Sequence, residues 1–268
     1  MAAIKPWEEL TIRDDYMFKL VMRKKRICKT MIEKLLRIHV GDIRYIDEEK
    51  TVKPKYESKG VRLDVYVAGS GEVFEIEMQV RQPEAGELPK RTRYYQATID
   101  TEHLVAGQKY KSLPTVYIIF ICPFDPFGLS RHIYTFRNLC VEDKGLELGD
   151  KTTKVIVNST GTADDVTPDV KAFLDYVNGI MSDDAFVREI DEEILRVKQI
   201  EQERVGYMTY EMKLEEEREF GREEGREEGK IEMVQEMLRN HQPLDFISKI
   251  SKFSVEKISE IGKMHGLL

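Results

Sequence analysis

The stretch Phe74-Glu75-Ile76-Glu77-Met78-Gln79 alternates apolar and polar side chains, and it decides how the first half of the chain folds. Successive side chains of a β-strand point to opposite faces. We therefore expect the three apolar residues to enter a core, with Glu75, Glu77 and Gln79 in a row on the other face. Carboxylate and amide oxygens are the ligands that a hard divalent cation prefers, so this row is a candidate metal site.

A second strand-like run, residues 61–67, lies directly upstream and contains Asp64. Only a short Ala68-Gly69-Ser70-Gly71 turn separates it from residues 73–80, so the two runs should pair as a hairpin. Asp64 would then lie beside Glu77. Carboxylates from two adjacent strands, with open positions for phosphate and water, suit Mg²⁺, with Mn²⁺ or Ca²⁺ as alternatives. Asp64, Glu75 and Glu77 are the candidate ligands; the alternative is a solvent-facing polar strand face without a metal.

The remainder of residues 1–165 predicts one layered α/β domain. Apolar residues recur at helical spacing over residues 14–38, where Asp15 is a further candidate acid. A second helix is expected over residues 88–105. The β-branched and aromatic run at residues 115–122 is typical of a central strand covered on both faces. Further strands are expected at residues 52–56, 132–138 and 154–157.

From about residue 168 the pattern is helical to the end. Helices are expected at residues 170–177 and 184–200. The Gly-Arg-Glu-Glu repeat at residues 221–230 lacks the apolar seam of a coiled coil and predicts an exposed helical linker. Residues 243–250 and 254–261 fit either a plain helical hairpin or a small helix-turn-helix unit. We therefore expect four segments, residues 1–165, 166–204, 205–240 and 241–268.

The composition indicates a soluble, charge-rich protein, with 41% hydrophobic and 34% charged residues and a net charge of −7. Three cysteines without a CxxC pairing argue against a disulfide scaffold and favour a reducing compartment. No run reaches about 18 apolar residues, so no membrane span is expected. The N-terminal residues lack the apolar core of a signal peptide, and we expect a cytoplasmic protein.

Negative charge is concentrated in residues 201–240, whereas residues 1–60 are basic. The cluster Arg23-Lys24-Lys25-Arg26 forms a positive patch of the kind that phosphate backbones need. Its alternative is a solvated helix face. On the helix at residues 88–105, Arg91 and Arg93 are candidates for contacting DNA phosphates or for orienting the carboxylates. DNA is therefore the expected partner.

These segments together resemble the PD-(D/E)XK nuclease superfamily and, more narrowly, its recombination-promoting nuclease (Rpn) and transposase group. The matching pieces cover most of the chain: residues 14–21, 60–67, 74–79, 91–95 and 107–110, with the Gly-Arg-Glu-Glu repeat behind them. The resemblance implies a restriction-endonuclease-like three-layer core with a mixed central sheet, followed by an all-helical tail. It also implies metal-dependent DNA cleavage linked to recombination, transposition or defence against mobile elements.

Carried over residue by residue, the resemblance gives Asp64 the first acidic place, Glu77 the (D/E) place and Gln79 the place of the usual lysine. A glutamine offers a dipole where a lysine offers a charge. The positive charge near the attacking water then has to come from another cation, such as a second metal or a nearby arginine, or catalysis is weakened. In an alternative register Glu75 is the ligand and Glu77 takes the lysine place; the match of Glu77-Met78-Gln79 to the group favours Glu77.

Two functions follow from this sequence. The first is a Mg²⁺-dependent DNA endonuclease. The second is a catalytically silent DNA-binding or protein-interaction module on the same fold. In either case the helical tail is a candidate for self-association into a homo-oligomer.

Overall fold

The computed structural model describes residues 4–47, 51–52, 61–62 and 64–268. The chain forms two compact units, which divide between Glu203 and Arg204. The first unit contains a mixed six-stranded sheet in the order β1-β4-β5-β6-β8-β7. Its strands are β1 (Arg44–Asp47), β4 (Val65–Ala68), β5 (Glu72–Met78), β6 (Thr115–Cys122), β7 (Ile133–Phe136) and β8 (Thr152–Asn158).

The sheet combines two parallel and three antiparallel pairings. β5 and β8 flank β6 in parallel, and β4 pairs antiparallel with β5 on the side of the sheet that ends at β1. The run of β6 is buried almost throughout, as its continuous β-branched and aromatic sequence predicts. The predicted α/β class with a mixed central sheet is confirmed.

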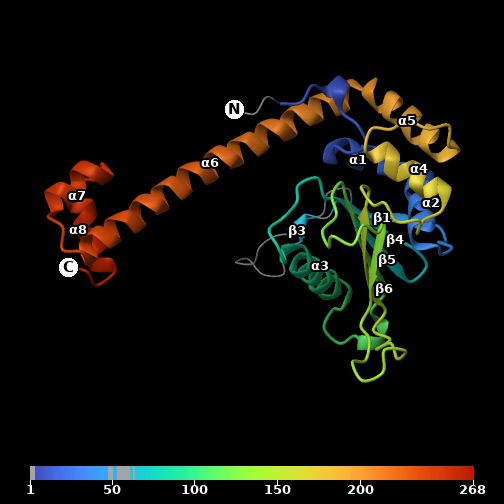
Figure 1. The fold of residues 1–268 in the computed structure, drawn as a ribbon, viewed down its shortest axis with the longest axis horizontal. Coiled ribbons are helices and arrows are strands. Elements are labelled where there is room, and N and C mark those ends of the chain that lie inside the picture. Colours follow the sequence, from blue (N-terminus) through green and yellow to red (C-terminus); the bar gives the residue numbers. More distant parts are fainter. Residues whose placement is uncertain (1–3, 48–50, 53–60, 63) are drawn as a thin grey trace. The chain divides into compact units, whose positions relative to one another are not determined.

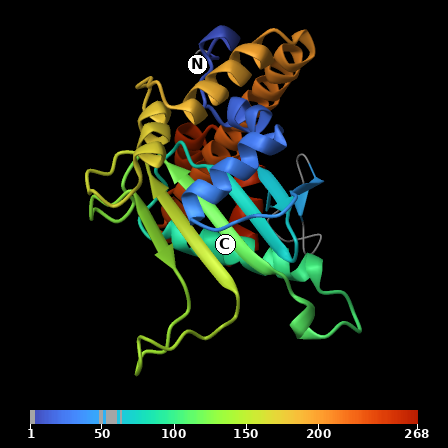
Figure 2. The ribbon, with the colours of Figure 1, turned by 90° about the vertical axis from the view of Figure 1, so that its right-hand side faces the viewer.

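Helices cover both faces of this sheet (Figures 1 and 2). On one face α3 (Glu87–His103) packs Leu88, Tyr95 and Ile99 against Ile118 and Phe120 of β6. On the other face lies α2 (Lys25–Leu36), while α1 (Asp15–Met22) contacts both β5 and α5 (Ala185–Lys198). α4 (Pro168–Val177) packs on α5. The result is the three-layer arrangement expected from the sequence.

The helix predicted over residues 14–38 is two helices, and the prediction of one continuous helix is wrong. α1 ends at Met22, and Lys24 adopts an extended backbone before α2 begins. Every residue from Met17 to Met22 is buried. A single straight helix has only one apolar stripe, so the break lets each half turn its own stripe to the core.

The strand predicted over residues 61–67 also changes partner along its length. β3 (Val61–Arg62) pairs with β2 (Thr51–Val52) in a separate two-stranded ribbon, whereas β4 joins the main sheet. Asp64 lies in a bend between the two. Most of the strand predicted at residues 52–56 lies outside the described residues.

Short 3-10 turns, η1 (Trp7–Glu9) and η2 (Tyr110–Ser112), complete the first unit. The Asp184 side chain accepts hydrogen bonds from the Phe186 and Val187 backbone N–H groups and so caps α5. Pro168 stands at the first position of α4, where a missing N–H costs nothing.

The second unit has its own apolar core. Val234 and Leu238 of α6 (Glu201–Arg239) pack with Ile247 of α7 (Leu244–Ser251) and with Ile258 and Ile261 of α8 (Val255–Met264). The Gly-Arg-Glu-Glu repeat lies on an exposed stretch of α6. A Cβ at Gly221, Gly225 or Gly229 would meet no neighbouring atom, so no close packing requires these glycines.

Candidate active site

Glu75 and Glu77 of β5, and Gln79 directly after it, lie in a row on the face of the sheet that α3 covers. β5 alternates its faces, and the register places Glu75 beside Tyr66 and Ile118, and Glu77 beside Phe120. The three polar residues are only 0%, 5% and 8% exposed. The alternative of a solvent-facing polar strand face is therefore wrong: both faces of β5 are buried, one by apolar and one by polar side chains.

Asp64 directly precedes β4, at the end of the sheet where β5 carries Glu77. The antiparallel register pairs Val65 with Ile76, so the next position along the ladder faces Asp64 toward Glu77. The Asp64 side chain is about nine-tenths buried. The register thus places the carboxyl groups of Asp64 and Glu77 side by side, with Glu75 one step further along the same face.

Burial raises the pKa of all three carboxyl groups. For Asp64 the pKa lies well above its usual range because of burial, and the negative charge of Asp15 raises it further. For Glu75 burial again acts first, followed by the charges of Asp64 and Glu77. For Glu77 burial raises the pKa, while Arg91 partly opposes the effect. Like charges in a dry site are costly, so the cluster favours a bound proton or cation.

Several oxygens of this cluster have no hydrogen-bond partner among the residues that the structure describes. They are both carboxylate oxygens of Glu75 and Oε2 of Glu77. Buried polar atoms in native proteins are normally satisfied, and an orphaned carboxylate oxygen indicates a missing positive partner. These atoms are the strongest local sign that the cluster has a ligand.

Lys19 brings a cation to the cluster from α1. Its Nζ lies 2.9 Å from Oδ1 of Asp64 and 3.0 Å from Oδ2 of Asp15, and the residue is only 7% exposed. Lys19 was not among the site residues predicted from the sequence. A signal was present, because Asp15 and Lys19 stand four positions apart on one helix and therefore share a face.

Arg91 brings a second cation to the cluster, from α3. Its Nη2 donates to Oε1 of Glu77 and its Nη1 to Oε1 of Gln79. Both Nε and Nη2 also donate to the Tyr95 hydroxyl. Gln79 in turn donates its amide to the carbonyl of Arg81. Both ends of the Gln79 amide are therefore engaged within the protein.

Comparison with known proteins identifies the family at this point. Residues 12–158 match the model of the PD-(D/E)XK nuclease family transposases. The chain belongs to this family. The match includes Asp64 and the whole β5 row, and with it the restriction-endonuclease-like fold and the predicted resemblance are confirmed. No curated protein and no solved structure matches the chain.

PD-(D/E)XK nucleases generally use divalent metals. The ligand atoms available here are of the type that a hard cation prefers. Asp64, Glu75 and Glu77 offer carboxylate oxygens, some of them orphaned. Among the described residues, however, no three His, Cys, Asp or Glu side chains gather into a metal-binding cluster. In this arrangement Asp64 forms an ion pair with Lys19, and Glu77 forms one with Arg91.

The predicted basic patch of this PD-(D/E)XK chain is largely paired with acids. Arg23 forms an ion pair with Glu203, Lys24 with Glu193 and Arg26 with Glu189. Lys25 is exposed, as is Arg93 on α3. Arg23 also lines a narrow crevice together with Lys19 and Asp64. Of the predicted patch, Arg23 therefore lies nearest to the carboxylate cluster.

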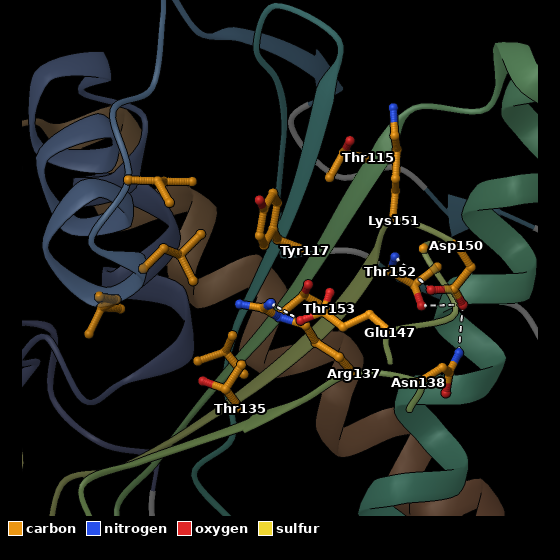
Figure 3. Close-up of a pocket in the computed structure, with 15 residues that line it drawn as sticks. Thr115, Tyr117, Thr135, Arg137, Asn138, Glu147, Asp150, Lys151, Thr152 and Thr153 are labelled. Carbon is orange, nitrogen blue, oxygen red and sulfur yellow. Dashed lines mark hydrogen bonds and ion pairs between the residues drawn. The ribbon is translucent and has the colours of Figure 1, made fainter. Parts of the chain in front are cut away.

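A larger cavity of about 340 Å³ lies elsewhere, on the sheet face opposite to α3 (Figure 3). Hydroxyl groups of Tyr117, Thr135 and Thr153 line it. Two of its acidic side chains are paired, Glu147 with Arg137 and Asp150 with Asn138, and Lys151 also lines it. It contains none of the acidic residues of the β5 row, so its size does not make it the candidate nuclease site.

No helix in the described parts of the chain is long and apolar enough to cross a membrane.

Proposed function

We propose that this chain is a divalent-metal-dependent endonuclease that hydrolyses phosphodiester bonds of DNA. The observation that carries the proposal is the buried carboxylate row on β5 beside Asp64, with orphaned oxygens, in a chain of the PD-(D/E)XK nuclease family. Asp64 and Glu77 would hold the metal, with Glu75 behind them. Mg²⁺ is the proposed ion, and Mn²⁺ and Ca²⁺ are the alternatives to be compared with it.

A metal held by these carboxylates would supply a polarised water and neutralise charge on the phosphate. The protein's own residues would do the remaining work. α3 and the apolar core beneath it exclude bulk water from the row, which strengthens every charge interaction within it. Arg91 fixes the orientation of Glu77 and Gln79. The exposed Lys25 and Arg93, and Arg23 at the crevice, would contact phosphates of the bound DNA.

The test uses supercoiled plasmid incubated with the purified protein in Mg²⁺, Mn²⁺, Ca²⁺ or EDTA. We expect nicking in Mg²⁺ or Mn²⁺ and none in EDTA. Asp64→Ala should abolish nicking, because the first acidic ligand is lost, while the far-UV circular dichroism spectrum stays unchanged. Undiminished cleavage by folded Asp64→Ala protein would overturn the proposed site.

One observation favours a second candidate, a catalytically silent DNA-binding module. Gln79 stands where the family pattern has lysine, and both ends of its amide are engaged by Arg91 and Arg81. Retained DNA affinity without cleavage in any of the metals would support this candidate. Cytoplasmic localisation, self-association through the helical tail, and a role in recombination, transposition or defence remain proposals for either candidate.

A further inference from the structure

Gln79 cannot take over the work of a strand lysine in this geometry. Its Oε1 accepts from Arg91 and its Nε2 donates to the Arg81 carbonyl. Nε2 has a second N–H, but the amide is neutral and held at both ends, so it brings no positive charge to a phosphate. If the site cleaves DNA, the positive charge opposite the phosphate has to come from another residue.

Two cations reach the carboxylates, and they differ in how much freedom they have. The Arg91 guanidinium contacts Glu77, Gln79 and the Tyr95 hydroxyl, and it also lies over the rings of Tyr95 and Phe120. Its planar group is fixed by these contacts. Arg91 therefore acts as a positioning residue for the row on β5.

Lys19 is held differently. Its ammonium is a compact point charge on a flexible stem, and it contacts two carboxylates, those of Asp64 and Asp15. The neighbouring residues Met17, Phe18, Leu20 and Val21 are all buried, so the backbone of α1 is firmly anchored next to the site. The anchored helix aims the ammonium at Asp64, and the crevice that both residues line also includes Arg23.

We propose that Lys19 is the catalytic cation of this site, supplied by α1 in place of the lysine that β5 lacks. This inference rests on the proposed nuclease function. With Asp64 holding a metal, the Lys19 ammonium would be less fully neutralised by that carboxylate and would be available to the non-bridging oxygens of the scissile phosphate. In the hydrolysis a water oxygen bonds to phosphorus, the bond from phosphorus to the leaving sugar oxygen breaks, and that oxygen gains a proton originating from the water. Lys19 forms and breaks no covalent bond; it stabilises the added negative charge.

The test compares the wild type with Lys19→Met, Lys19→Arg and the control Lys34→Met. Lys34 is a lysine of the neighbouring helix α2 that pairs with Asp169, away from the site. Single-turnover cleavage of a labelled duplex gives the rate, and fluorescence anisotropy in Ca²⁺ gives the DNA Kd. We expect Lys19→Met to cleave about 100-fold more slowly, the loss typical of one electrostatic stabiliser of a transition state. Its DNA Kd should stay within about threefold of the wild type, and Lys19→Arg should recover at least tenfold of the lost rate.

Mn²⁺ affinity, measured by electron paramagnetic resonance, separates a catalytic from a merely structural role. A structural Lys19 holds Asp64 in place, so its loss would weaken Mn²⁺ binding. The catalytic role predicts equal or tighter Mn²⁺ binding in Lys19→Met, because a competing positive charge is removed. Should Lys19→Met fail to fold, Asp15→Asn combined with Lys19→Met removes the like charge left beside Asp64 and is tested in its place.

The outcomes distinguish this inference from the function on which it rests. If the wild type cleaves and Lys19→Met cleaves within about fivefold of it, the inference is overturned and the nuclease function stands. Weaker Mn²⁺ binding in the variant also overturns it. A wild type that cleaves in no metal removes the nuclease function, and the inference falls with it.

Discussion

Arg91 of α3 forms an ion pair with Glu77 of β5, across the boundary between the helical layer and the sheet. The Glu77 side chain is almost fully buried, whereas about a third of the Arg91 side chain is exposed. The pair therefore links a carboxylate that cannot reach water to a guanidinium that can. α3 covers the acidic row and at the same time compensates part of its charge.

Removing the Arg91 side chain should destabilise the protein strongly, although about a third of that side chain is exposed. Arg91→Met leaves the Glu77 carboxylate buried without its cation, and the free energy of unfolding should fall by about 3 kcal/mol. Adding Glu77→Gln to that variant removes the uncompensated charge and should restore more than half of the loss. Urea denaturation in EDTA measures both, with Arg93→Met as the exposed control on the same helix, expected within about 0.5 kcal/mol of wild type. Equal stability of Arg91→Met and wild type would contradict the proposed pairing.

Glu75→Gln should stabilise the metal-free protein at neutral and alkaline pH. The Glu75 carboxyl is fully buried, and its oxygens have no hydrogen-bond partner in the described part of the chain. Burial first, and then the charges of Asp64 and Glu77, raise its pKa in the folded state. The folded protein thus binds this proton more tightly than the unfolded chain, and wild-type stability falls as the pH rises through the interval between the two pKa values.

A glutamine at position 75 does not titrate, so its advantage over wild type should grow from about pH 5 to about pH 8. We expect a gain of about 1–2 kcal/mol at the higher pH, or roughly 3–6 °C in Tm. Thermal melts in EDTA measure it, beside Glu72→Gln on the same strand, which is half-buried and should change little. A lower Tm for Glu75→Gln at pH 8 would refute the account of an uncompensated carboxyl.

Asp169→Asn should lower stability at neutral pH and lose this effect in acid. The hydrogen bond from Lys34, with help from Thr167, lowers the pKa of Asp169 to about 2. A depressed carboxyl pKa stabilises the folded state above its unfolded value, near 3.9, and the contribution disappears as the pH falls toward the folded value. The full shift corresponds to about 2.5 kcal/mol. Because about a third of the side chain is exposed, solvent screening reduces the expected loss to about 1 kcal/mol.

Urea midpoints at about pH 7 and about pH 3 check the Asp169 prediction, with the exposed Asp42→Asn as the control. The gap between variant and wild type should be smaller at the lower pH. A gap that is constant or wider in acid would argue that Lys34 and Asp169 do not pair in solution.

A basic residue whose charge is neutralised by an acidic neighbour should contribute less to DNA binding than a basic residue without such a neighbour. Lys25, Arg26 and Arg93 are all exposed, but Arg26 is paired with Glu189 at 2.6 Å. Lys25→Ala and Arg93→Ala should each reduce the slope of log Kd against log salt by about 1, and Arg26→Ala by less. Anisotropy of a labelled duplex between about 50 and 200 mM KCl in Ca²⁺ measures the slopes. Equal effects of all three substitutions would show that the pairing on α5 does not shield Arg26.

The sequence predicted the parts of this fold that depend on local patterns. The hairpin of β4 and β5 follows from alternation and a short turn, and β6 follows from its uninterrupted apolar run. What the sequence did not reveal was how distant segments compensate charge. Arg26 and Glu189 are 163 residues apart, and Lys24 and Glu193 are 169 apart. A charge run looks the same in a sequence whether it faces DNA or an acidic helix.

In the candidate site, too, local patterns could be predicted from the sequence and contacts between distant segments could not. Asp64, Glu75, Glu77 and Gln79 could be proposed from spacing within one hairpin. The burial of their face could not, because it depends on where α3 packs. Lys19 was missed because its contact with Asp64 joins α1 to the strands, and the break after Met22 that separates α1 from α2 has no strong helix-breaking residue to mark it.

Plasmid cleavage by Glu77→Gln beside the wild type tests the central claim most directly. The substitution keeps the shape of the side chain and an acceptor for Arg91, and it removes only the charge needed to hold a cation. We predict that the wild type nicks supercoiled plasmid in Mg²⁺ or Mn²⁺, and that folded Glu77→Gln protein leaves the plasmid intact under the same conditions. Cleavage by Glu77→Gln at the wild-type rate would contradict the claim that the buried row on β5 is the nuclease site.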